Sequence, residues 1–276
     1  MAHEFDGKKY EQASAHQKEW GERLVAELSL RGDERVLDLG CGDGALTARI
    51  AEALPRGEVI GIDASRGMIQ VALQKKRHNL EFLRMDIDDW SFSEQFDVVF
   101  SNATLHWVKD HSRLLANVRT SLKEGGLFRF DFGGEGNCSH FLKVIREAMA
   151  DEAFSSYFKD FPWPWHMPSV GEYEALVRQA GFVEARVWGE IADRFFPDRE
   201  TMIRWVDQPS LVPFLARVAE EHKAAFRGFV VRRMVEETLQ PDATCFETFR
   251  RINVFARKKS ASPKRVANEQ YPFVPQ

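Results

Sequence analysis

The chain has 276 residues, of which 44% are hydrophobic and 29% charged, and it carries a formal net charge of -4. These values are typical of a globular protein with one large domain, with or without an insertion, and the negative charge disfavours a nucleic-acid partner. The polar N-terminus is unlike a signal peptide, and no run approaches the roughly 18 apolar residues of a membrane span. Three widely separated cysteines fit neither a disulfide framework nor a zinc site. We therefore expect a cytoplasmic protein without a metal or a membrane segment.

Apolar strands alternate with amphipathic helices in the first half of the chain. The spacing of Trp20, Leu24 and Leu28 predicts a helix over residues 11–30. The strands that follow are expected at 35–39, 58–62, 80–85, 96–101 and 127–130, with helices at 44–54, at 65–76 and around 114–122. Strands that alternate with helices in this way predict right-handed crossovers and a parallel, doubly wound sheet.

The second half of the chain is rich in aromatic residues. Ser169 and Glu172 form a capping box that begins a helix ending at Gly181, and a sixth strand follows at 182–188. Three helical patterns over 198–239 then precede a last alternating segment at 245–257. We therefore predict an α/β fold with a Rossmann-like, seven-stranded, mostly parallel sheet and a helical lid inserted before the last strand.

A glycine-rich turn, Asp38-Leu39-Gly40-Cys41-Gly42-Asp43-Gly44, connects the first strand to its helix. These glycines also fit the dinucleotide pattern G-x-G-x-x-G/A, in which a pyrophosphate lies at the helix N-terminus. Asp38 and Asp43 would repel such an anion by about one to a few kcal/mol per charge pair. Their charges favour an adenosine ligand that carries a sulfonium and an ammonium group, and NAD is the main alternative.

Two further acids end the next two strands. Asp63 ends the second strand, where a carboxylate can accept both hydroxyls of a ribose, as it also does in NAD sites. Asp86 follows the third strand, where it could accept an adenine amino group while Ile87 packs on the ring. The fourth strand opens into an apolar loop, Ser101–Trp107, at the edge where open α/β sheets bind ligands. The pattern predicts one ligand site along the carboxyl ends of these strands.

Four motifs occur in the order and at the intervals of one enzyme family. They are Val36–Gly44, Gly61–Asp63, Met85–Ile87 and Phe96–Asn102. With these motifs, residues 10–131 resemble the class I S-adenosylmethionine-dependent methyltransferases. Residues 10–18 and 105–107 resemble more narrowly the small-molecule carboxyl O-methyltransferases, among them the juvenile hormone acid, trans-aconitate and malonyl-carrier-protein enzymes.

The resemblance implies S-adenosylmethionine as cofactor, S-adenosylhomocysteine as its product and a small molecule as methyl acceptor. The expected cofactor-binding residues are Tyr10, Gln17, Asp38, Gly40, Gly42, Gly44, Asp63, Ala64, Met68, Asp86, Ile87 and Asn102. The expected reaction is direct methyl transfer to a carboxylate or other oxygen, in which positioning supplies most of the catalysis. Transfer to carbon or nitrogen, a tRNA acceptor and a non-catalytic cofactor-binding protein are the alternatives.

The acceptor is expected beside the loop that follows the fourth strand. His106 and Trp107 are the candidate catalytic residues, and His106 acts either as a base or as a lining residue, because a carboxylate needs no base. The expected substrate-binding residues are Gln17, His106, Trp107, Trp163, Trp165 and Trp205. Six arginines are candidates for binding an anionic substrate, each with a solvated helix-surface charge as the alternative: Arg199, Arg204, Arg217, Arg227, Arg232 and Arg233.

These assignments divide the chain into five parts. They are an N-terminal helical cap (1–30), a cofactor-binding α/β core (31–197), a helical substrate lid (198–242), the last strand of the core (243–259) and a flexible tail (260–276). We expect the protein to be a monomer or a weak dimer.

Overall fold

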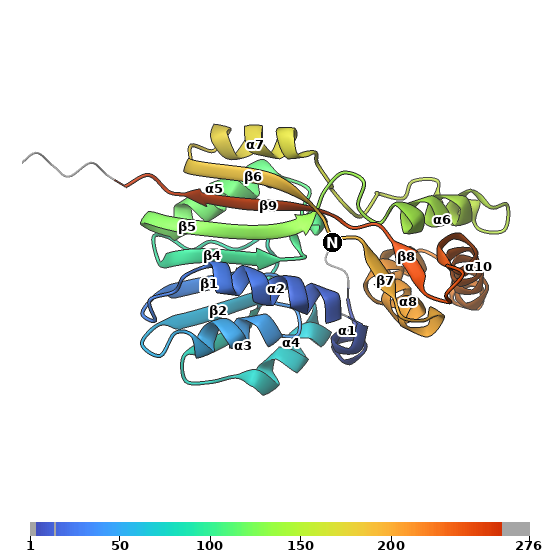
Figure 1. Cartoon of the computed structure of the whole chain (residues 1–276), viewed down its shortest axis with the longest axis horizontal. Coiled ribbons are helices and arrows are strands. Elements are labelled where there is room, and N and C mark those ends of the chain that lie inside the picture. Colours follow the sequence, from blue (N-terminus) through green and yellow to red (C-terminus); the bar gives the residue numbers. More distant parts are fainter. Residues whose placement is uncertain (1–3, 14, 261–276) are drawn as a thin grey trace, which may run out of the picture.

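A computed structural model of the chain describes residues 4–13 and 15–260, so the expected tail falls outside the described residues apart from residue 260. Helices cover both faces of a central sheet, and a second group of helices lies beyond one end of the strands (Figure 1). The seven strands are ordered β3-β2-β1-β4-β5-β9-β6. Because β9 alone is antiparallel to its neighbours, the predicted Rossmann-like, mostly parallel sheet is confirmed.

The strands of the large sheet lie where strands were predicted, but β5 extends the strand expected at 127–130 to 122–133, and β9 covers only the second part of the segment expected at 245–257. They are β1 (Arg35–Leu39), β2 (Glu58–Asp63), β3 (Leu80–Arg84), β4 (Phe96–Asn102), β5 (Leu122–Gly133), β6 (Val183–Ile191) and β9 (Arg250–Arg257). In β1, residues 36–39 are all buried, because helices cover both faces of the sheet at its centre. Strands that are buried on both faces have continuous apolar sequences, and this pattern allowed them to be predicted.

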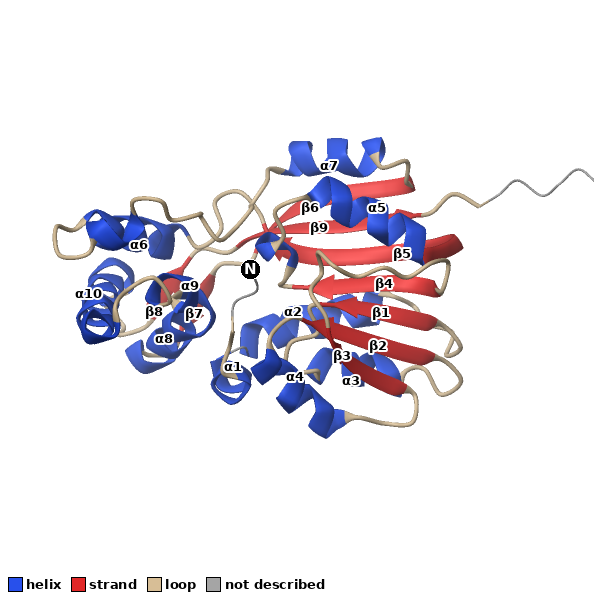
Figure 2. Cartoon of the chain, turned by 180° about the vertical axis from the view of Figure 1, so that it is seen from behind, coloured by secondary structure: helices blue, strands red, loops and turns tan. Residues whose placement is uncertain are grey.

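Two layers of helices enclose the sheet (Figure 2). One layer holds α5 (His111–Ser121) and α7 (Val170–Gln179), and the other holds α2 (Ala15–Glu27), α3 (Ala45–Glu52) and α4 (Arg66–Ala72), which η1 (Leu73–Lys75) extends. Leu115 of α5 and Val177 of α7 are fully buried against one face of the sheet, and Leu24 and Ile50 against the other. The short α1 (Gly7–Ala13) packs on α4 and also contacts α8 of the second helical group. No described helix combines the length and the apolar character that a membrane crossing needs.

The second helical group, here called the lid, comes from two stretches of the chain. The first stretch contains α6 (Ser139–Ala150) and η3 (Ser155–Phe158), and the second contains β7 (Arg194–Phe196), α8 (Arg199–Trp205), η4 (Val206–Ser210), α9 (Val212–Leu215), α10 (Glu220–Thr238) and β8 (Cys245–Glu247). Helix α6 packs on α10, and Phe141, Phe214 and Phe226 share their buried core. The lid therefore includes residues 139–158 as well as the helices of the predicted lid at 198–242.

The segment 245–257 was predicted as one strand, and this prediction is wrong. Its first part, β8, pairs with β7 in a separate two-stranded sheet, and β9 joins β5 and β6 in the large sheet. At the break, the Phe249 amide donates to Asp193 Oδ1 at 2.9 Å, and the Thr248 carbonyl accepts from the Cys138 amide at 2.8 Å. No glycine or proline marks this change of partner, so the sequence reads as a single strand.

Candidate active site

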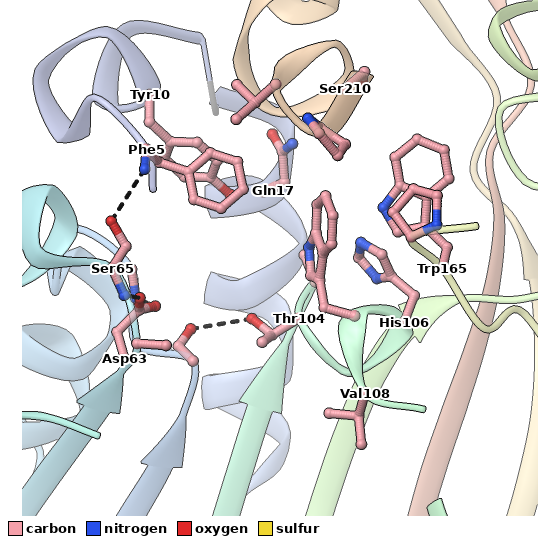
Figure 3. Close-up of a pocket in the computed structure, with 18 of the residues that line it drawn as sticks. Phe5, Tyr10, Gln17, Asp63, Ser65, Thr104, His106, Val108, Trp165 and Ser210 are labelled. Carbon is pink, nitrogen blue, oxygen red and sulfur yellow. Dashed lines mark hydrogen bonds between the residues drawn. The ribbon is translucent and has the colours of Figure 1, made fainter. Parts of the chain in front are cut away.

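A cavity of about 800 Å³ lies between the carboxyl ends of β1–β4 and the lid. Every residue expected at the site lines this cavity except Gly44. Figure 3 shows Asp63 and Ser65 on one side, His106 and Trp165 on the other, and Gln17 between them. A cavity of this size is sufficient for a small-molecule site.

The glycine turn is held by main-chain hydrogen bonds to β2. The amides of Gly40 and Cys41 donate to the Ile62 carbonyl at 2.8 and 2.9 Å, and the Gly42 amide donates to Asp63 Oδ2 at 3.0 Å. Gly42 has a φ of 54°, and a Cβ atom there would meet no atom within 4 Å. The turn therefore brings bare backbone to an open space, which is what a closely bound ligand requires.

Gly44 has a different role from the other two glycines of the turn. Its φ is 76°, and a Cβ atom there would lie 2.6 Å from the ring of Phe82. The residue lies at the start of α3 and outside the cavity lining. The structure therefore gives Gly44 a packing role between α3 and β3, in place of the predicted contact with a ligand.

Two buried carboxyls lie beneath this turn. Asp38 Oδ2 accepts a hydrogen bond from the Thr47 hydroxyl at 2.7 Å, and burial raises the pKa of Asp38 to about 7. Asp63 Oδ1 accepts from the Ser65 amide at 2.9 Å, and burial raises the pKa of Asp63 to about 6. Burial penalises the charged form of both groups, so a cation in the cavity would stabilise both carboxylates.

Acidic and basic residues are separated along the cavity. The acids that line it all belong to the N-terminal segment, to the glycine turn or to the ends of β1, β2 and β3; they are Glu4, Asp38, Asp43, Asp63, Asp86 and Asp88. Lys18 is the one lining cation near them, and its Nζ lies 2.8 Å from Asp43 Oδ2. The other lining cations, Lys109, Arg217 and Arg251, lie on the lid side. One end of the cavity therefore suits a cation and the other an anion.

Two side-chain amide oxygens in the cavity wall are buried without a hydrogen-bond partner in the described chain. They are Oε1 of Gln17 and Oδ1 of Asn102. The Asn102 amide donates to the main-chain oxygen of Gln17 at 2.9 Å, which joins α2 to the end of β4. Buried acceptors without donors are costly, so these two oxygens fit a ligand that carries N–H groups, such as an α-ammonium.

His106 lies on η2 (Leu105–Trp107) and faces the lid side of the cavity. Burial and, to a smaller extent, the positive charge of Arg251 lower the pKa of His106 to about 3. The ring therefore stays neutral at physiological pH and is too weak a base to take a proton efficiently. Its ring centroid lies 5.5 Å from that of Trp107, which lies 5.5 Å from that of Trp165. These three rings form one continuous wall of the acceptor side.

Two lining residues of the cavity, Glu4 and Phe5, have no recognisable signal in the sequence. Glu4 accepts hydrogen bonds from the Gly67 amide at 2.6 Å and the Arg66 amide at 3.1 Å, which fixes the N-terminal segment on α4. The ring of Phe5 then reaches across the cavity to within 5.7 Å of Trp107, between ring centroids. These contacts depend on where the N-terminal segment packs, and no local pattern encodes that.

Of the six candidate arginines of the lid, only Arg217 lines the cavity. Arg227 forms an ion pair with Asp207 at 2.7 Å, and Arg233 forms one with Glu147 at 2.9 Å. Arg251 lines the cavity although it was not among the candidates.

Comparison with known proteins agrees with the fold and the cavity. Residues 36–126 match the family of methyltransferase domains. The trans-aconitate 2-methyltransferase of Deinococcus radiodurans is 32% identical over 211 residues, which are 74% of this chain and 79% of that protein. The enzyme of the same name from Rhizobium etli is 29% identical over 85% of this chain and 91% of its own length.

Solved structures show the same fold. The YcgJ protein of Bacillus subtilis matches with a TM-score of 0.60 and 15% identity, over 88% of this chain and 100% of that one. Phosphoethanolamine N-methyltransferase 2 of Haemonchus contortus, solved in complex with S-adenosyl-L-methionine, matches with a TM-score of 0.58 and 19% identity. The match covers 92% of this chain and 57% of the Haemonchus chain.

The fold and the cavity define a class I methyltransferase, an enzyme that uses S-adenosylmethionine. Within that class, the chain belongs to the family of the trans-aconitate 2-methyltransferases. The predicted class, fold and cofactor are thereby confirmed.

Proposed function

We propose that the enzyme methylates a carboxylate oxygen of a small organic acid. The separation of charge along the cavity carries this proposal, because the acids lie toward the glycine turn and the cations toward the lid. S-adenosylmethionine supplies an electrophilic methyl group on a sulfonium, which is a good leaving group. The acidic end suits this cation, and the basic end suits an anionic acceptor.

The lack of a suitable base on the acceptor side supports the same acceptor. Among the described lining residues on that side, His106 has a pKa of about 3, and burial raises the pKa of the Cys138 thiol well above its usual value. An amine that is protonated at neutral pH must lose a proton before methyl transfer, and a hydroxyl must lose one during it, whereas a carboxylate is already ionised at neutral pH. A carboxylate therefore needs only to be held in line with the methyl group, with water excluded.

The residues toward the glycine turn are proposed to hold the cofactor. Asp63 would accept the ribose hydroxyls, Asp86 the adenine amino group, and Asp38 would face the sulfonium and ammonium charges, while Ile87 and Met68 would pack on the adenine. Tyr10, Ala64 and the backbone of Gly40 and Gly42 would complete the binding surface. The remaining assigned residues, Gln17, His106, Trp107, Trp163, Trp165 and Trp205, are proposed to enclose the acceptor, and Gln17 and Asn102 also to face the methionine end of the cofactor.

We further infer a cytoplasmic location and a monomer or weak dimer. The free cysteines of the described chain, Cys41, Cys138 and Cys245, are in keeping with a reducing compartment. Sedimentation at micromolar concentration tests the predicted oligomeric state.

The test of the proposed reaction pairs each acid with its own uncharged analogue. The enzyme is incubated with S-adenosylmethionine and trans-aconitate, other carboxylic acids, the corresponding primary amides, and amines. We expect S-adenosylhomocysteine and a base-labile methyl ester from acids and no product from the amides. Methylation of an amine without any ester would contradict the proposal.

A further inference from the structure

We infer that the acceptor is a carboxylic acid with an apolar body, whose carboxylate Arg251 binds and whose body lies against the aromatic residues of the lid. The inference rests on the proposed function and names the substrate class of the same site. It departs from a tricarboxylic acid such as trans-aconitate, the compound in the name of the relatives.

Arg251 lies at the edge of the sheet that forms the floor of the cavity. It pairs in register with Gly133, the last residue of β5, because β9 is antiparallel and its first residues meet the carboxyl end of β5. Its side chain is 4% exposed and still contributes to the cavity lining. A guanidinium stays charged even where it is buried, so this position brings a permanent positive charge to the acceptor side.

One nitrogen of the Arg251 guanidinium, Nη1, is available to donate a hydrogen bond to a ligand. Nε donates to Asp131 Oδ1 at 2.8 Å, and Nη2 donates to the same oxygen, while Nη1 has no hydrogen-bond acceptor among the described residues. The guanidinium carbon lies 4.5 Å from the ring centroid of Trp20, which restrains the plane of the group. An oriented N–H donor of this kind is suited to a carboxylate oxygen of the ligand.

The lid side of the cavity, which Arg251 also lines, is walled by apolar side chains. Trp163 and Trp165 pack edge to face at 5.6 Å between centroids, and Trp165 packs likewise on Phe141 at 6.2 Å. Trp205 and Val212 complete the wall that these residues form on the cavity. The rings of these aromatic residues also pack in the lid's own core. A small polar acid would not cover the side that faces the cavity, and this apolar surface would stay in contact with water. A ligand with an apolar body covers this surface and removes it from water.

The charges on the acceptor side are too few for three buried carboxylates. Arg251 is the one buried cation among the described lining residues of this side, and Asp131 takes its Nε and Nη2 donors, which leaves Nη1 for one ligand carboxylate. The Lys109 ammonium donates to the Trp163 carbonyl at 2.5 Å, and Lys109 and Arg217 are both exposed. One carboxylate can therefore be bound deep in the cavity, and any further carboxylate would face apolar side chains without a cation.

Binding and turnover of matched acids test the inference with the unmodified enzyme. Binding of trans-aconitate, hexanoate, decanoate and 3-phenylpropanoate to the enzyme saturated with S-adenosylhomocysteine is measured by calorimetry, and kcat/KM is measured for the same acids. We expect decanoate or 3-phenylpropanoate to exceed trans-aconitate at least about tenfold in both measurements, since each buried methylene contributes about 0.8 kcal/mol. Preference for trans-aconitate by a similar factor would overturn this inference and leave the proposed function intact. The inference also fails if none of the apolar acids binds, and methylation confined to amines would contradict the proposed function itself.

Substitution of Arg251 tests whether this residue contacts the acid. Arg251→Gln should weaken binding of the preferred acid at least about tenfold, as expected for the loss of a charged hydrogen bond, and leave S-adenosylhomocysteine binding within twofold. The matched control is Arg129→Gln, because Arg129 is also buried, pairs with Glu27 at 2.8 Å and lies 4.8 Å from the ring centroid of Trp188, but is not part of the cavity lining. Equal losses in both variants, or unchanged acid binding in Arg251→Gln, would overturn the role of Arg251.

The apolar wall has its own test, which does not depend on the stability of the Arg251 variant. Trp163→Ala should lower kcat/KM for decanoate more than for hexanoate, whereas Trp188→Ala, outside the cavity, should change neither. An equal loss for both acids in Trp163→Ala would contradict contact with the acceptor's body.

Discussion

Asp63 offers the most direct test of the proposed cofactor site. Its two carboxylate oxygens accept from the amides of Gly42 and Ser65 at 3.0 and 2.9 Å, and each oxygen keeps a second lone pair for a ligand. Asp63→Asn removes the charge and replaces one oxygen with an NH2 group, which cannot accept a hydrogen bond. The loss of a charged hydrogen bond costs about 1.5–3 kcal/mol, which corresponds to about ten- to hundredfold weaker S-adenosylhomocysteine binding.

Calorimetry at pH 8, where the wild-type carboxyl with its pKa of about 6 is ionised, measures this loss. The matched control is Asp97→Asn, because Asp97 Oδ2 also accepts a backbone amide, that of Arg35 at 2.9 Å, but lies outside the cavity. Both variants should melt at a lower temperature than the wild type, and only Asp63→Asn should bind the ligand weakly. Binding within twofold of wild type in a folded Asp63→Asn protein would refute the assignment of Asp63 to the cofactor.

Three further predictions concern the same cavity. Burial raises the pKa of Asp38 to about 7, so between about pH 4 and 7 the folded protein holds a proton that the unfolded chain releases, and the stability of the ligand-free protein should fall as the pH rises through this window. Asp38→Asn should therefore melt higher than the wild type at pH 8 and bind S-adenosylmethionine more weakly; an unchanged or lower melting temperature contradicts this. Gly42→Ala should lose ligand binding with a stability cost of about 1–2 kcal/mol, whereas Gly44→Ala should lose more stability because its Cβ meets Phe82, as denaturant titration can show. His106→Gln should lower kcat less than about tenfold and keep the shape of its pH profile between pH 6 and 9, because His106 has a pKa of about 3; loss of a titration near neutral pH would show that it acts as a base.

The residues expected on the cofactor side line one cavity because the signals that identify them are local. Asp38 and Asp63 lie at the carboxyl ends of β1 and β2, Asp86 lies just beyond β3, and parallel strands have their carboxyl ends on one edge of a sheet. The alternation of strands and helices along the chain is therefore enough to predict that these acids lie close together. The helix α6 was missed although Phe141, Val144, Ile145 and Ala148 recur at helical spacing, so this signal was present in the sequence.

The acceptor side could not be predicted to the same degree, because it depends on a long-range pairing. Arg251 reaches the cavity only because β9 enters the sheet antiparallel, and the sequence does not show the direction of a last strand. The pKa of His106 depends on burial and on the charge of Arg251, which lies far from His106 in the sequence. The sequence therefore left a base and a lining residue as alternatives for His106, and the low pKa in the folded chain favours the lining role.

The antiparallel β9 also explains how one sheet edge can carry both charges. In the order β3-β2-β1-β4-β5-β9-β6, the acids lie at or just beyond the carboxyl ends of the first three strands, and Arg251 is the second residue of β9, which is three strands beyond β1. Neighbouring strands are about 4.8 Å apart, so the acidic and basic ends of the cavity are separated by about 14 Å along the edge. Such a separation lets each charge hold its own ligand. The loop after β4, with His106 and Trp107, lies between the two ends, which is where a methyl group must pass from one ligand to the other.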